Sequence, residues 1–233
     1  MAPQIVNMFP EHIIYVEPFV GGGGVYFYKT PSEFEIINDM DKTLISNYRL
    51  ILKAPLDVSK YRKDLTTIDN ITAFLKGKIT TNADKLTEAI IRNCNGFSST
   101  YINSNNHVYI SSDPFSKLIN IRQYKDRLHN TIIENRGYKY ILKKYDSPET
   151  LFYLDPPYEE SSNLYKHAMI DYVDMANILQ GIKGRFLLSI NDSKEIREIF
   201  HMFKIKKLKL ETNAGYISPI GSKKRGELLI INY

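Results

Sequence analysis

The sequence predicts an α/β fold: a mostly parallel sheet with helices on both faces and a mainly helical insertion in its middle. Two observations support this prediction. Near the N-terminus, two short apolar runs that read as buried strands alternate with segments of helical character. This alternation stops at residue 55 and resumes at residue 138. The predicted domains are therefore residues 1–54 together with 138–233, interrupted by an insertion at 55–137.

Residues 1–54 contain the first two predicted strands. The apolar run 13–16 reads as a strand that enters a tight turn at four consecutive glycines, residues 21–24. Residues 25–29 are predicted to begin a helix, and residues 34–37 form a second strand. A further helix is predicted from apolar residues at helical spacing, namely Leu44, Ile45, Tyr48, Ile51 and Leu52.

The C-terminal part of the chain contains the remaining strand signals. The predicted elements are, in order, strands at 138–142, 151–154 and 185–190, an amphipathic helix at 193–203, and strands at 204–210 and 227–232. Two of these strands end in polar residues, Asp155 after the second and Asn191-Asp192 after the third. We expect the segment 188–192 to lie beside a ligand site rather than to do chemistry.

The insertion differs from the rest of the chain in composition and charge. It has mixed helical stretches and a Ser/Asn/Thr-rich segment at 93–112, with a hairpin-like turn at 103–106. Residues 53–145 contain 16 Lys and Arg against 8 Asp and Glu, a net charge of +8. Such a basic segment suits a polyanionic partner, and it equally suits a solvated charged surface.

The glycine turn and Asp39 both follow predicted strands. In an open α/β sheet, ligands bind beyond the carboxyl ends of the strands. Glycine lets the backbone approach a ligand closely and adopt positive φ, while the spacing excludes a P-loop. Asp39, at the end of the second strand, is placed to accept hydrogen bonds from both hydroxyls of a ribose. Its alternative role is that of a helix N-cap or a solvated loop acid.

The tetrapeptide Asp155-Pro156-Pro157-Tyr158 is the most specific signal. Two prolines after a buried strand fix the directions of the flanking side chains. A carboxylate and a backbone carbonyl that accept from an exocyclic amine favour a pyramidal nitrogen and stabilise the positive charge that develops on it. The tyrosine ring offers a stacking face to a base that has left the duplex. A rigid proline turn with a buried tyrosine is the structural alternative.

Together these motifs resemble the Dam-type (D12 class) adenine-N6 DNA methyltransferases. The matching segments are residues 15–23, Ile37-Asn38-Asp39, Asp155-Pro156-Pro157-Tyr158, 188–192 and 223–229. The resemblance implies a Rossmann-like core that binds S-adenosylmethionine, without metal. It also implies transfer of a methyl group to N6 of adenine in double-stranded DNA, by in-line attack of a flipped base.

The resemblance also assigns roles to individual residues. Those implied to bind the cofactor are Glu17, Pro18, Phe19, Gly21, Gly23, Asp39, Met40 and Asp155. The implied catalytic residues are Asp155, Pro156 and Tyr158. Those expected to contact DNA, within a target-recognition insertion and a C-terminal loop, are Arg92, Asn95, Lys223, Lys224 and Arg225.

Other features limit the location and the partners of the protein. No apolar run approaches the ~18–20 residues that span a bilayer, and Met1-Ala2-Pro3-Gln4 lacks the start of a secretion signal. Cys94 is the single cysteine, and the five histidines lack metal-ligand spacing, so we expect an intracellular protein without a metal site. The family's Lys-containing motif about 20 residues before the glycine turn is not found here, and we expect a homodimer or another partner to complete that site.

Two other classes of function remain open on the residues. The same tetrapeptide chemistry suits amino methylation of cytosine N4, of adenine in RNA or of a protein glutamine. A DNA-binding protein that kept the fold and lost catalysis is the second class, although Asp39 and residues 155–158 are all present.

Overall fold

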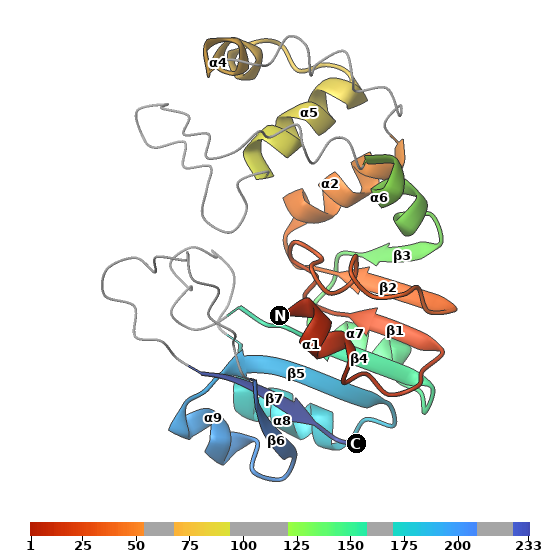
Figure 1. The fold of residues 1–233 in the computed structure, drawn as a ribbon, viewed down its shortest axis with the longest axis vertical. Coiled ribbons are helices and arrows are strands. Elements are labelled where there is room, and N and C mark those ends of the chain that lie inside the picture. Colours follow the sequence, from red (N-terminus) through yellow and green to blue (C-terminus); the bar gives the residue numbers. More distant parts are fainter. Residues whose placement is uncertain (54–67, 94–120, 158–169, 209–225) are drawn as a thin grey trace. The chain divides into compact units, whose positions relative to one another are not determined.

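The computed structural model describes residues 1–53, 68–93, 121–157, 170–208 and 226–233 (Figure 1). The chain forms two compact units, one of residues 1–41 with 132–233 and one of residues 42–131. The helix α2 (Lys42–Lys53), which the sequence analysis placed in the first domain, belongs to the second unit.

In the part of the chain that the structure describes, the first unit is built on a seven-stranded sheet with the order β3-β2-β1-β4-β5-β7-β6. Strands β1, β2, β4 and β5 are mutually parallel, and β7 is antiparallel to β5 and β6. This confirms the mostly parallel sheet that the sequence predicts. The strands are β1 (Ile14–Glu17), β2 (Phe34–Asn38), β3 (Thr131–Glu134), β4 (Thr150–Leu154), β5 (Arg185–Asn191), β6 (Lys204–Leu208) and β7 (Glu227–Ile231).

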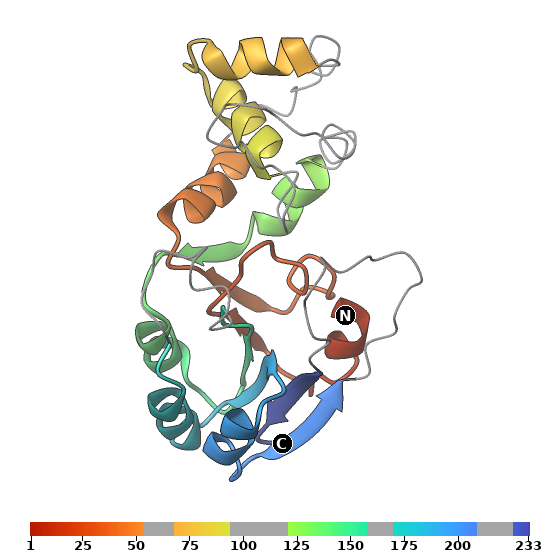
Figure 2. The same cartoon turned by 90° about the vertical axis from the view of Figure 1, so that its left-hand side faces the viewer.

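One face of the sheet packs against three helices, α7 (Tyr138–Tyr145), α8 (Tyr172–Gln180) and α9 (Lys194–Ile199). Alternate strand residues such as Phe152, Leu154, Phe186, Leu188 and Ile190 point to this side and form the main core. Figure 2 shows α7 and α8 side by side on this face. Both α8 and α9 begin at a side-chain N-cap, Asp171 and Ser193 respectively, which accepts from a backbone N–H of the first turn.

The other face of the sheet is covered by the short helix α1 (Ala2–Val6) and by the segment that links β1 to β2 (Figures 1 and 2). The rings of Tyr15 and Tyr153 lie there, with ring centroids 5.7 and 6.0 Å from that of Phe9. Glu17 and Ser189 are on this face by the alternation along their strands, because Val16 and Leu188 face the helices.

Three local predictions were wrong. Residues 138–142 form the start of α7 and not a strand, because the pattern Tyr138, Ile141, Leu142, Tyr145 continues with helical period and buries one side. Residues 25–29 form turns and not a helix; the N–H of Lys29 bonds to the Val25 carbonyl. The helix predicted at 193–203 ends at Ile199. The sequence analysis did not identify β3 or α8.

The second unit is helical where the structure describes it. It contains α2, α4 (Ile68–Lys76), α5 (Asn82–Asn93) and α6 (Ile121–Leu128). Ile45 and Tyr48 of α2, Leu86 of α5 and Leu128 of α6 are buried. The predicted hairpin turn at 103–106 lies outside the described residues. None of the helices described in either unit is long and apolar enough to cross a membrane.

Candidate active site

Three loops at the carboxyl edge of the sheet are joined by Asn38, the fully buried last residue of β2. Its side-chain amide donates to the carbonyl of Pro18, after β1, at 2.8 Å, and to the carbonyl of Arg136, after β3, at 2.9 Å. Its Oδ1 accepts from the Arg136 N–H at 2.8 Å. The loop after β3 is held a second time, since Asn135 donates to the carbonyl of Asp39 at 2.7 Å. These bonds fix the loops after β1, β2 and β3 relative to one another.

We expect Asn38→Ala to destabilise the protein by about 2 kcal/mol, because it leaves one buried and two partly buried backbone groups without this partner. Asn135→Ala removes one partly buried hydrogen bond and should cost about 1 kcal/mol. Equilibrium unfolding in urea, followed by circular dichroism, gives both values. Equal losses in the two variants would contradict the role of Asn38 as the junction of the three loops.

The glycine turn and Asp39 are also in contact. Gly21 and Gly23 have φ of 47° and 68°, a conformation that glycine adopts readily and other residues rarely adopt. The Gly21 N–H donates to Oδ2 of Asp39 at 3.0 Å, and the Asp41 N–H donates to Oδ1 at 2.9 Å. Burial raises the pKa of Asp39, while these N–H bonds lower it. Each carboxylate oxygen accepts more than one bond, so Asp39 can hold the turn and still accept from a ligand.

Glu17 and Asp155 follow neighbouring parallel strands at the same edge. Glu17 ends β1 and is 2% exposed, and Asp155 follows β4 and is half-buried. The pKa of Glu17 is raised to about 8, chiefly by burial, and the negative charge of Asp155 contributes to this rise. The strand order reverses between β1 and β4, and such a switch point is where open α/β sheets bind their ligands.

The other described residues that the sequence analysis assigned to this edge differ in exposure. Phe19 is partly buried, with its ring centroid 5.3 Å from that of Tyr138. Pro18 and Pro156 are buried, whereas Met40, next to Asp39, is 49% exposed. An exposed methionine beside the ribose-binding candidate offers an apolar surface to a ligand base.

The end of β5 carries a charged cluster. Asp192 accepts from Arg197 at 2.7 and 2.9 Å and lies 3.8 Å from Lys207. The backbone of Gly226 lies close to this cluster, since a Cβ atom added to Gly226 would be 2.9 Å from the Lys207 side chain. The Asp192 carboxylate is therefore occupied by cations of its own chain. Across the described residues, no group of three or more His, Cys, Asp or Glu side chains could hold a metal ion.

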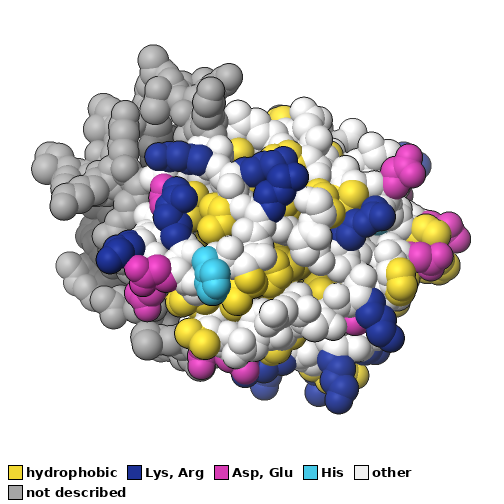
Figure 3. Space-filling view, turned by 90° about the horizontal axis from the view of Figure 1, so that it is seen from below, with side chains coloured by type: hydrophobic (Ala, Val, Ile, Leu, Met, Phe, Trp, Pro, Cys, Tyr) yellow, Lys and Arg dark blue, Asp and Glu magenta, His cyan; other side chains and the backbone are white. Residues whose placement is uncertain are grey.

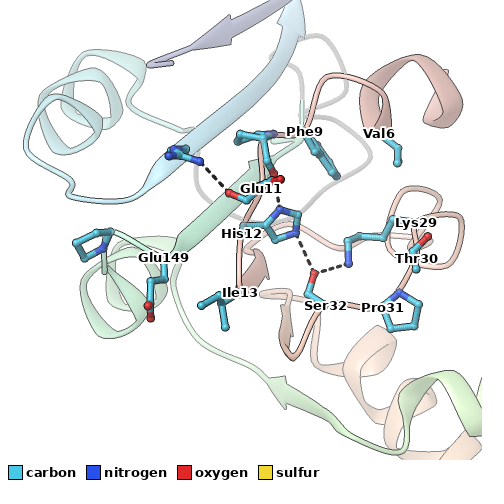
Figure 4. Close-up of a pocket in the computed structure, with 13 residues that line it drawn as sticks. Val6, Phe9, Glu11, His12, Ile13, Lys29, Thr30, Pro31, Ser32 and Glu149 are labelled. Carbon is cyan, nitrogen blue, oxygen red and sulfur yellow. Dashed lines mark hydrogen bonds between the residues drawn. The ribbon is translucent and has the colours of Figure 1, made fainter.

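A cavity of 810 Å³ lies at the opposite, amino edge of the sheet (Figure 4). Its lining comes from residues that precede β1, β2 and β4 and from the first residue of β5; the polar ones include His12, Lys29, Ser32, Glu149 and Arg185. Figure 4 shows His12 and Lys29 converging on Ser32, whose Oγ is 2.9 Å from His12 Nε2 and 2.8 Å from Lys29 Nζ. This cavity is not the ligand site that the sequence analysis predicts at the carboxyl edge.

Several predicted site residues lie outside the described part of the chain. These are Asn95, Tyr158, Lys223, Lys224 and Arg225. Arg92 is in the last turn of α5, and its side chain is not described. Conversely, sequence reasoning gave no separate role to Asn38, Asn135, Tyr15 or Lys29. Of these, Asn38 and Tyr15 had a signal, because they stand inside the matched segments Ile37-Asn38-Asp39 and 15–23.

The strand order and the carboxylates that follow β1, β2 and β4 define a doubly wound α/β protein with its ligand site at the carboxyl edge of the sheet. The comparisons with known proteins add the family. The model of one family, the D12 class N6 adenine-specific DNA methyltransferases, matches residues 1–213. The chain therefore belongs to this class, and the family and the activity predicted from the sequence are confirmed. Membership implies S-adenosylmethionine as methyl donor and DNA as substrate.

Individual relatives are distant. The type II methyltransferase M.CviBI of Paramecium bursaria Chlorella virus NC1A is 24% identical over 201 residues, which cover 80% of this chain and 76% of the relative. The type II methyltransferase M1.LlaDCHI of Lactococcus lactis subsp. cremoris is 24% identical over 265 residues, covering 100% of this chain and 91% of the relative.

Solved structures with a similar course of the chain include an rRNA methylase from Streptococcus thermophilus, with a TM-score of 0.40, 9% identity, and coverage of 99% and 92% of the two chains. A protein from Streptococcus mutans solved in complex with SAH has a TM-score of 0.41 and 9% identity, with coverage of 100% and 95%.

Proposed function

We propose that this protein methylates N6 of adenine in double-stranded DNA at a specific sequence, on a base that has left the duplex, with S-adenosylmethionine as its cofactor. The observation that supports this proposal best is that Glu17, Asp39 and Asp155 lie at the carboxyl ends of β1, β2 and β4, around the switch point between β1 and β4. In the same proposal, residues 55–137 recognise the DNA, and residues 1–54 with 138–233 hold the cofactor and the reacting base.

The residues at this edge fit S-adenosylmethionine. Asp39, anchored by the N–H groups of Gly21 and Asp41, accepts from the ribose hydroxyls. Gly21 and Gly23, without side chains, let the backbone approach the ligand closely. Glu17 offers a buried carboxyl to the positive charge of the ligand. When bound, this cofactor supplies the methyl group that is transferred.

The tetrapeptide after β4 handles the adenine. The Tyr172 hydroxyl donates to the carbonyl of Pro157 at 3.2 Å, which ties the proline turn to the start of α8. The Asp155 carboxylate and the carbonyl of Pro156 accept the two N–H bonds of the adenine amine, and this stabilises the positive charge that develops on N6. Tyr158 stacks on the flipped base. One N6 proton leaves after transfer.

The DNA is bound mainly by the second unit. Residues 42–131 contain 14 Lys and Arg against 7 Asp and Glu, a net charge of +7, whereas the rest of the chain has a net charge of −2. Figure 3 shows the end of the first unit that carries α9 and β6; Lys and Arg side chains are scattered there among neutral, acidic and hydrophobic ones, so the described residues form no uniformly basic surface on that end. Arg92 and Asn95 position the recognition segment, and Lys223, Lys224 and Arg225 contact the DNA backbone.

Product analysis tests this function. The protein is incubated with isotope-labelled S-adenosylmethionine and, separately, with double-stranded DNA, single-stranded DNA and RNA of the same sequences. We expect labelled N6-methyladenine by mass spectrometry, and only from double-stranded DNA. Label in N4-methylcytosine or in RNA would contradict the proposed substrate. DNA binding without any methylated product would contradict the proposed catalysis.

The proposed phosphate contacts predict how the affinity for DNA depends on salt concentration. Each phosphate neutralised by the protein contributes about −0.9 to the slope of log K against log salt concentration. Lys224→Ala should therefore lower the affinity for all duplexes alike and reduce this slope by about one unit. The matched control is Lys183→Ala, an exposed lysine that precedes β5 at the opposite edge of the sheet. Fluorescence anisotropy at several salt concentrations measures both slopes, and equal slopes would remove the C-terminal loop from the DNA interface.

A further inference from the structure

A buried tyrosine on the same strand binds the side chain of Glu17. Tyr15 and Glu17 are two residues apart on β1 and therefore point to the same face of the sheet. The Tyr15 hydroxyl donates to Glu17 Oε2 at 2.7 Å, and Tyr15 is fully buried. With both groups out of water, this bond fixes the rotamer of the Glu17 side chain.

The tyrosine ring is in turn covered by a buried cation. Lys29 Nζ lies 4.4 Å from the centroid of the Tyr15 ring. The ammonium group is fixed there by an ion pair with Glu35 at 2.6 Å, in which both side chains are buried, and by Ser32 at 2.8 Å. Ser32 also contacts His12, which places the far end of this polar cluster at the amino-edge cavity (Figure 4). The cluster therefore extends from that cavity to the carboxyl edge of the sheet.

The groups around Glu17 act on its charge in opposite directions. The pKa of Glu17 is raised to about 8, chiefly by burial. The charges of Asp155 and Glu35 add to this rise, whereas the Tyr15 hydrogen bond and the charge of Lys29 oppose it. Because the pKa in the folded protein exceeds the ordinary value of 4.5, the proton stabilises the fold. This contribution is fully present below about pH 4.5 and is lost as the pH rises through about 8.

We propose that Tyr15 and Lys29 are positioning residues that orient the Glu17 carboxyl and allow it to release its proton when the cationic cofactor binds. The inference rests on the proposed contact between Glu17 and S-adenosylmethionine. The empty protein holds Glu17 as a neutral acid at neutral pH. A positive ligand beside it favours the carboxylate, which Tyr15 then holds through its hydroxyl, while the proton passes to water.

This coupling makes cofactor affinity depend on pH. If the ionised form binds, the affinity of the wild-type protein rises with pH up to about pH 8, by up to about tenfold per unit, and then levels off. The α-amino group of the ligand titrates near the same pH, about 7.7–8.0. The variant Glu17→Gln removes the part of this pH dependence that comes from Glu17 and keeps the part that comes from the ligand's α-amino group. The difference between the two pH profiles is therefore due to Glu17.

The first test measures binding of S-adenosylmethionine to wild type and Glu17→Gln by calorimetry between pH 6 and 9. Repeating it in buffers of different ionisation enthalpy counts the protons released. We expect the wild type to release more protons than Glu17→Gln at pH 7. Identical proton release would overturn the inference while leaving the proposed function intact. Failure of the wild type to bind the cofactor at any pH would instead contradict the proposed function.

The second test uses Tyr15→Phe, which removes the hydroxyl and keeps the buried ring. We expect the pH at which the affinity levels off to rise by about one unit, because the ionised carboxylate loses a hydrogen bond. KM for the cofactor at pH 7 should rise several-fold with kcat nearly unchanged. The matched control is Tyr153→Phe, a buried tyrosine on the neighbouring strand β4. If the pH profile of cofactor affinity is the same in Tyr15→Phe, the control and the wild type, the proposed role of Tyr15 is wrong.

Lys29 is tested by a paired replacement, because its removal alone leaves Glu35 buried without its cation. Lys29→Met with Glu35→Gln takes out both charges at nearly constant volume. Since Lys29 lowers and Glu35 raises the Glu17 pKa, and the lysine has the larger effect, we expect the binding profile to move to higher pH. If the double variant is folded, as judged by its thermal unfolding, and its profile is unchanged, the Lys29–Glu35 pair has no net influence on Glu17 and Lys29 is not a positioning residue.

Discussion

Asp155→Ala is expected to lower the turnover of adenine methylation by about 100- to 1,000-fold, the loss seen when one group that stabilises developing charge is removed from an active site. The carboxylate acts only while N6 becomes positive, so the affinity for S-adenosylmethionine should change by no more than several-fold. Single-turnover methylation of a duplex and a separate cofactor titration measure the two effects. Removal of the Asp155 charge also lowers the pKa of Glu17, which should strengthen cofactor binding near neutral pH.

Two controls accompany this variant. Asp155→Asn keeps an acceptor oxygen and should lose less turnover than the alanine variant. Asp192→Asn changes an aspartate that follows the neighbouring strand β5, where the carboxylate is bound to Arg197, and its turnover should stay within several-fold of the wild type. A near-normal rate in Asp155→Ala would assign the amine contact to a different residue.

Asp39→Ala is expected to weaken the binding of S-adenosylmethionine about ten- to a hundredfold, since losing a hydrogen bond to a charged group costs about 1.5–3 kcal/mol. The structure adds a second reason for a large effect. The Asp39 carboxylate also accepts from the Gly21 N–H, so the variant releases the glycine turn that the cofactor approaches. Isothermal calorimetry gives the change in affinity directly.

The matched control for this prediction is Asp41→Ala. Asp41 bonds to Asp39 through its backbone N–H, which the substitution keeps, so the cofactor affinity should remain close to that of the wild type. Asp39→Asn should be intermediate, because an amide oxygen can still accept one of the two N–H bonds. Unchanged affinity in a folded Asp39→Ala variant would place the ribose elsewhere.

Much of the sheet was predictable because its strands are short apolar runs bounded by turn residues. The sequence located β1, β2, β4 and β5 to within about a residue or two, and their carboxyl ends put Glu17, Asp39 and Asp155 on one edge. The segment 138–142 was misassigned because five residues satisfy both an alternating and a helical pattern, and only burial of Tyr138, Ile141 and Leu142 against the sheet distinguishes them.

The supporting parts of the site were less accessible to sequence reasoning. Asn38 and Arg136 are 98 residues apart in the chain, and nothing in the sequence pairs them. Tyr15 reads as an ordinary apolar strand residue, and Lys29 as a surface lysine, until the sheet and the loop after the glycine turn bring them together. Such contacts depend on tertiary packing, whereas strand ends depend on local pattern.

The strand β7 gives the sheet an unusual order of assembly during synthesis. It lies between β5 and β6, although it follows both in the sequence. While the ribosome is still making residues 209–226, β6 has no partner, and β5 exposes an open edge beside Leu187 and Ser189. Chain elongation runs at roughly 5–20 residues per second, so the synthesis of these residues takes about one to four seconds. The lysines of β6, Lys204, Lys206 and Lys207, then discourage pairing of that unprotected strand with another nascent chain.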